Sequence, residues 1–219
     1  MNPKPTHEFE GDFETHVTVH CTASELADLG EWAAVRPGVK LTHIVLGRGR
    51  VRSQPMLTIT GTGTLATQQA AAQDLTQQLT RSGFAPTRVK IEASPWATGV
   101  PQDAPQAAKL GPDFYFEHHI KLLLNPDVDW QSLAHIAIPH GAHVSWNARR
   151  VLQTGHQERF VTQRCHHIGL PEAADALTSL CTTLREHGHE PKSIEREFVV
   201  YDSDASVDEG WIEQKTVTQ

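Results

Sequence analysis

Hydrophobic and polar residues alternate along several short segments of this chain, and two of these segments open with the same phrase. Residues 13–19 read FETHVTV and residues 116–122 read FEHHIKL, 103 residues further on. Apolar residues at alternate positions are typical of a β-strand with one buried face. The repeated phrase therefore predicts two copies of one structural unit in a single chain.

Each copy continues with the same succession of patterns. In the first copy, helices are predicted after the N-cap candidates Ser24 and Thr67, and further strands over 42–48, 56–62 and 88–93. The second copy repeats this order. The order β-α-β-β-α-β, found twice, is that of the ferredoxin-like unit, in which the first and third strands are central and both helices cover one face of the sheet.

The expected fold class is α+β, a tandem duplication of a ferredoxin-like βαββαβ unit. We expect the first unit over 1–100, a linker over 101–112, and the second unit over 113–219, with an acidic tail at 201–219. The faces of the two antiparallel sheets that carry no helices are polar. We therefore expect them to face each other across an interlobe cleft, where polar groups are tolerated.

Alternation also assigns side chains to the two faces of each sheet. The predicted core combines the apolar face of the first strand in each unit with the apolar stripe of the second helix. It comprises Phe13, Val17, Leu75, Leu79, Phe116, Ile120, Leu177 and Leu180. Ile194 is expected on the same face of the sheet as these strand residues. The cleft is expected to be lined by Glu14, His16, Glu92, Glu117, His119, Lys121, Glu195 and Glu197. Glu and His recur there at matched positions of the two copies.

Composition restricts the class of protein. Hydrophobic residues make up 38% and charged residues 21%, as in a soluble globular protein. The net charge is −7, and residues 111–219 hold sixteen acidic but nine basic side chains, which argues against generic nucleic-acid binding. Three cysteines without a CxxC pair predict reduced thiols in a cytoplasmic protein. The N-terminal residues are polar and lack the apolar core of a signal peptide, and no apolar run is long enough to span a membrane. We therefore expect no membrane association.

The leading functional hypothesis is the binding, with hydrolysis as a further step, of a small anionic or phosphorylated ligand in the cleft. Glu117 and His119 are the predicted acid and base. The other predicted ligand-binding residues are Glu14, His16, Lys121, Arg149, Glu195 and Glu197. Arg149 stands where the first copy has the alternating arginines of residues 48–52, and guanidinium groups bind anions through two parallel hydrogen bonds. The alternative is a solvated sheet face with Glu–His and Glu–Lys pairs.

Two tetrapeptides resemble a motif of a known family. HVTV at 16–19 resembles the His-x-Thr/Ser-x motif of the two-histidine phosphoesterases, and HVSW at 143–146 is a second match. The resemblance implies that one histidine acts as base and the other as acid, with the hydroxyl groups holding phosphate. In that family the two motifs occupy equivalent positions. Here the repeat matches His16 with His119, which has no hydroxyl residue two positions later.

A metal-dependent enzyme is the second hypothesis. Glu117 and His119 share a strand face and could reach one divalent ion, completed by His140 and His143 or by His166 and His167. The spacing fits none of the common structural zinc patterns. A non-catalytic binding module or homodimer is the third hypothesis. The sequence leaves open whether the protein is an enzyme and which cofactor it uses.

Overall fold

The two copies fold with the same order of elements, as predicted. The computed structural model describes residues 7–150 and 155–212. Residues 1–6 of the polar start and 213–219 of the acidic tail lie outside this description. The first half comprises β1 (Glu10–His20), α1 (Ala23–Ala34), β2 (Lys40–Leu46), β3 (Ser53–Thr64), α2 (Leu65–Arg81) and β4 (Ala85–Ala93). The second comprises β5 (Tyr115–Leu124), α4 (Trp130–Ala137), β6 (Ala142–Asn147), β7 (Gln157–His166), α5 (Leu170–Glu186) and β8 (Pro191–Asp202).

Among the described residues, three short helices lie outside this repeat. They are α3 (Ala104–Leu110), η1 (Ile138–His140) and η2 (Ala205–Asp208). α3 lies within the stretch expected to be a linker, where Asp103 caps it by accepting a hydrogen bond from the backbone N–H of Gln106. No described helix is long and apolar enough to cross a membrane.

The helices of the first half begin earlier than the sequence suggested. The N-cap of α1 is Thr22, whose hydroxyl accepts from the Glu25 backbone N–H, while the Glu25 carboxylate accepts from the Thr22 N–H. Likewise α2 is capped by Thr64, with Thr67 at the third helical position. A capping box satisfies two backbone donors at once, so each helix begins at the residue that can make both bonds.

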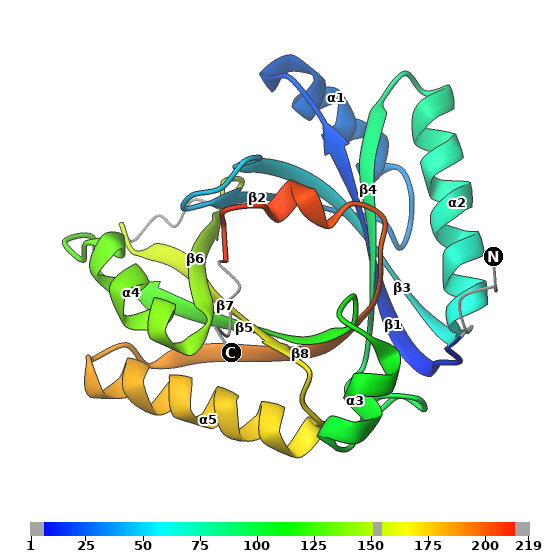
Figure 1. The fold of residues 1–219 in the computed structure, drawn as a ribbon. Helices are drawn as coiled ribbons and strands as arrows, with labels where there is room; N and C mark the ends of the chain where they lie inside the picture. Colours follow the sequence, from blue (N-terminus) through cyan, green and yellow to red (C-terminus); the bar gives the residue numbers. More distant parts are fainter. Residues whose placement is uncertain (1–6, 151–154, 213–219) are drawn as a thin grey trace.

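All eight strands form one closed antiparallel barrel, in the order β1-β3-β2-β6-β7-β5-β8-β4. Within each half the first and third strands are central, which confirms the ferredoxin-like order. The halves are joined at two seams, where β2 pairs with β6 and β4 pairs with β8. The expected cleft between facing sheets is therefore the interior of a barrel, and the helices cover its outside (Figure 1). β2, which is an edge strand in a single ferredoxin-like unit, is paired on both sides here.

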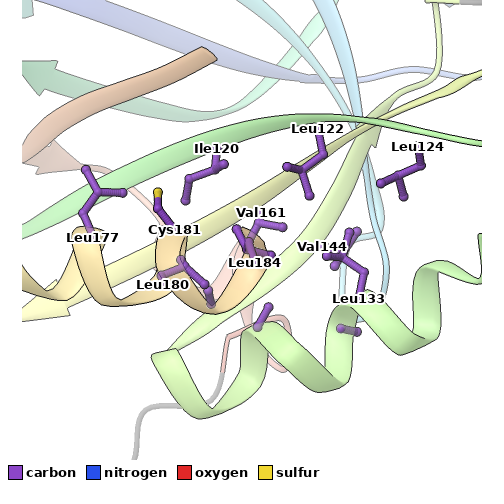
Figure 2. Close-up of a cluster of buried hydrophobic side chains, with 13 residues drawn as sticks. Ile120, Leu122, Leu124, Leu133, Val144, Val161, Leu177, Leu180, Cys181 and Leu184 are labelled. Carbon is purple, nitrogen blue, oxygen red and sulfur yellow. The ribbon is translucent and has the colours of Figure 1, made fainter. Parts of the chain in front are cut away.

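The hydrophobic core lies between the barrel wall and the outer helices. In the second half, α4 and α5 pack Leu133, Leu180 and Leu184 against Ile120 and Val161 of the wall (Figure 2). All eight predicted core residues are buried. Burying one such side chain stabilises the fold by about 1.5–3 kcal/mol. Ile194 lies opposite Ile120 and so shares its face of the sheet, as expected, but it is 40% exposed at the start of β8 and does not belong to the core.

Residues 203–212, here called the C-terminal strap, cross one end of the barrel (Figure 1). The loop between β2 and β3 holds the strap: the Arg50 backbone N–H donates to the Glu209 carbonyl at 2.8 Å, and Arg48 Nε donates to the Trp211 carbonyl at 3.0 Å. Trp211 is buried. These arginines, which the sequence suggested for anion binding, therefore contact the chain itself.

Candidate functional site

Two histidines occupy matched positions inside the barrel. Val17 and Ile120 pack into the outer core, so the neighbouring His16 and His119 point inward. His16 lies opposite Thr58 on β3, and its Nδ1 is 2.8 Å from Thr58 Oγ1. In the second half, His119 lies opposite Thr162 on β7, with 3.0 Å between Nδ1 and Oγ1. The predicted match of His16 with His119 is confirmed.

The other ring nitrogen of each histidine meets a carboxylate of the last strand in its half. His16 Nε2 is 2.6 Å from Glu92 Oε2, and His119 Nε2 is 3.2 Å from Glu197 Oε2. Thus each half contains a Thr–His–Glu chain across three strands, with the same orientation of the imidazole. Because the repeat brings β4 and β8 to equivalent places, Glu92 and Glu197 are equivalent residues.

Burial and neighbouring charges act in opposite directions on these histidines. Burial lowers the pKa of His119, but its hydrogen bond to Glu197 and the charge of Glu117 outweigh that effect and raise the pKa to about 9. The pKa of His16 is also raised, because Glu92 outweighs burial. At neutral pH the imidazolium of His119 therefore balances part of the acidic charge around it.

The structure gathers possible metal ligands in two groups. One comprises Glu92, His119 and Glu197, and the other comprises Glu14, His16 and Glu197. Within each group, one ligand atom per residue lies within 4.8 Å of the others. Glu197 belongs to both groups, which therefore lie next to each other at the interface of the two halves.

Glu117 has other partners. Its Oε2 accepts from Lys90 Nζ at 2.6 Å, and its Oε1 accepts from Arg164 Nε at 2.9 Å. Burial raises the pKa of Glu117, but Arg164 and Lys90 outweigh that effect and lower it to about 2. The carboxylate is therefore ionised across the physiological range. It lies beside the histidine cluster but in neither group of possible metal ligands.

The remaining predicted binding residues are spread over several places. Lys121 Nζ is 3.8 Å from Glu158 Oε1. Glu195 is exposed on β8 opposite His119. Arg149 is exposed after β6 and lies against Gly30 of α1, on the outside of the barrel. The structure therefore brings together Glu14, His16, His119 and Glu197 but places Arg149 elsewhere.

A second charged network fills the barrel end beneath the strap. Arg88 and Arg164 both donate to Asp208 Oδ2, and Gln54 donates to Asp208 Oδ1. Asp202 on β8 accepts two further hydrogen bonds from Arg88. Sequence reasoning missed Arg164 and Asp208. Period-two alternation from Thr162 could have placed Arg164 on the inner face, but no pattern in the tail indicated that Asp208 returns to the barrel.

The histidines proposed to complete a metal site with His119 lie in other surroundings. His140, His166 and His167 line a surface cleft of about 1980 Å³ beside the strap, to which Arg164 and Asp208 also contribute. His143, the histidine of the second phosphoesterase-like tetrapeptide, is buried and bonds through Nδ1 to the Val144 backbone N–H. None of these four belongs to either group of possible metal ligands.

The chain has only distant similarity to the solved structures that it matches. No protein-family model matches the chain, and neither does any curated protein. Among solved structures, the acetolactate synthase small subunit of Thermotoga maritima is 11% identical over 87% of this chain and 95% of its own, with a TM-score of 0.30. A protein provisionally named a chlorite dismutase is 14% identical over the same shares, with a TM-score of 0.26. We draw no functional conclusion from similarities at this level.

Proposed function

We propose that the protein binds a divalent transition-metal ion inside the barrel, where the two halves meet, and takes a small anionic ligand onto that ion. The observation that supports the proposal is the convergence of Glu92, His119 and Glu197 within 4.8 Å. Imidazole nitrogen and carboxylate oxygen are common ligands of such ions, at bond lengths of about 2.0–2.2 Å. Ligand atoms around one ion are then roughly 3–4 Å apart. Small movements of these three side chains towards one another would therefore bring their ligand atoms to the distances that one ion requires.

The charges around this group favour a cation. Burial and the neighbouring Glu92 raise the pKa of Glu197, which means that two carboxylates are held close together at a cost. Glu92 is completely buried. Burial raises the pKa of Glu92, but Lys90 Nζ and His16 Nε2, each 2.6 Å from one of its oxygens, outweigh that effect and hold the pKa well below its usual value. Glu92 is therefore ionised beside Glu197. A metal ion would satisfy both carboxylates and would displace the proton of His119.

The same charges argue against an anion bound directly to the cluster. Glu14, Glu92 and Glu197 surround the histidines, so an anion needs an added positive charge to bind among them. The ion supplies that charge, and it would activate a water molecule if the ligand is hydrolysed. Glu14 marks the solvent-exposed side of the cluster, since its side chain is 46% exposed.

The test is metal binding by the purified protein after removal of metals with EDTA. Titration with Zn²⁺ or Mn²⁺ should show a site that Glu197→Gln and His119→Ala weaken at least tenfold. Glu31→Gln on the exposed face of α1 is the matched control and should bind as the parent does. Circular dichroism establishes that each variant is folded. The absence of metal binding by the parent protein, or binding unchanged in both site variants, would refute the proposal.

A second candidate is anion binding without metal, favoured by the raised pKa of His119, which keeps the imidazolium charged at neutral pH. In this case inorganic phosphate binds in the presence of EDTA, and His119→Ala abolishes that binding. Under the metal proposal, phosphate binds only after the metal has been restored. A single titration with and without EDTA therefore separates the two candidates.

A further inference from the structure

We infer that the barrel holds two metal ions bridged by Glu197, the second ion being bound by Glu14, His16 and Glu197. This inference rests on the proposed function, because it adds an ion beside the first. The geometry that supports it is the second group of ligand atoms, again within 4.8 Å of one another and sharing Glu197 with the first group. A carboxylate has two oxygens and can bind one ion with each, and paired ions in proteins are about 3.5–4 Å apart.

The internal repeat supplies one histidine to each group, because His16 and His119 occupy matched positions. The carboxylates of the two groups are not matched in this way, since Glu92 corresponds to Glu197 and Glu14 corresponds to Glu117. Each imidazole uses Nδ1 for a threonine hydroxyl, and so its Nε2 faces the carboxylates. When Nδ1 carries the proton and donates it to the hydroxyl, the Nε2 lone pair is available to an ion. Thr58 and Thr162 are the positioning residues that set this orientation.

The two sites differ in access to solvent. Glu92, which belongs only to the first group, is completely buried, whereas the Glu14 side chain is 46% exposed. The first ion would therefore be enclosed and the second would lie nearer to solvent. A ligand from solution would therefore meet the Glu14 side of the cluster first.

Charge balance indicates the class of ligand. Glu14, Glu92 and Glu197 together carry three negative charges. Lys90 lies between Glu92 and Glu117, so its positive charge is shared by the two. Glu117 also pairs with Arg164. One divalent ion leaves these three carboxylates with an excess of about one negative charge. A second ion reverses the sign. The two-ion form then attracts an anion with at least two oxygens, such as a phosphate group, which can contact both ions.

The experiment measures how many Mn²⁺ ions bind to the full chain, by calorimetry and by electron paramagnetic resonance. We expect two ions per chain in the parent protein, with the spectral signature of exchange between neighbouring Mn²⁺ ions. Glu14→Gln should bind one ion, lose that signature and bind inorganic phosphate at least tenfold more weakly. The half-exposed position of Glu14 makes this variant compatible with folding, and Glu31→Gln should retain two ions.

The possible outcomes separate this inference from the proposed function. No Mn²⁺ bound to the parent protein refutes both. One ion per chain, or two ions without magnetic exchange, supports a metal site but overturns the bridged pair. Two ions in Glu14→Gln would also overturn the assignment of the second site.

Discussion

Replacing Asp208 by Asn should destabilise the protein by about 2–3 kcal/mol at neutral pH. Asp208 is 5% exposed and accepts hydrogen bonds from Arg88, Arg164 and Gln54. The asparagine has nearly the same shape but no charge. Arg88 keeps Asp202 as a partner and Arg164 keeps Glu117, so the variant loses one carboxylate from a network that is otherwise intact.

The magnitude follows from the pKa of the carboxyl group. Burial raises the pKa of Asp208, but Arg164 and Arg88 outweigh that effect and lower it from 3.8 to about 2. At about 1.4 kcal/mol for each pKa unit, this difference is worth about 2.5 kcal/mol. Because the folded-state pKa is below the unfolded-state value, this stability is present above pH 4 and is lost as the pH falls from about 4 towards 2.

Urea unfolding followed by circular dichroism provides the assay, at pH 7 and at steps down to about pH 3. The free energies of unfolding of parent and Asp208→Asn should differ most at pH 7, and the difference should narrow to about half by pH 3. Glu209→Gln is the matched control on the neighbouring residue. Glu209 is exposed and lies 3.7 Å from Arg50, so the control should change stability by less than about 1 kcal/mol. A loss below about 0.5 kcal/mol in Asp208→Asn, or a difference that does not depend on pH, would refute the reasoning.

Three further predictions concern the core, a helix cap and the thiols. Leu180→Ala leaves a cavity under α5 and should lower the free energy of unfolding in urea by about 2–5 kcal/mol. Ile194→Ala, at an exposed position, should lower it by less than about 1 kcal/mol. Equal losses in the two variants would contradict the described packing. Thr22→Ala removes the capping box of α1 and should cost about 1 kcal/mol, measured in the same way, unless the helix starts elsewhere. Cys21 should react with a thiol reagent well before the buried Cys165 and Cys181, and burial raises the pKa of Cys165 to about 11; faster reaction of Cys165 would contradict its buried position.

Local patterns in the sequence determined the repeated unit and the face of each strand. Val17 and Ile120 pack outward and His16 and His119 inward because side chains alternate across a strand, a rule that needs no distant contact. The matched positions of His16 and His119 follow from the phrase shared by β1 and β5. The order βαββαβ likewise follows from helix and strand periods within each copy.

Tertiary structure alone decided how the two units join and which charges meet. Pairing of β2 with β6 and of β4 with β8 depends on strand edges from different halves, and nothing in a strand's own alternation specifies its partner. This closure places Glu92 next to His119 and Glu197. It also brings the strap back over the barrel, where Asp208 meets Arg88 and Arg164. Alternation fixes the direction of a side chain, but only the closed sheet fixes which side chain lies across from it, and that decided the composition of the site.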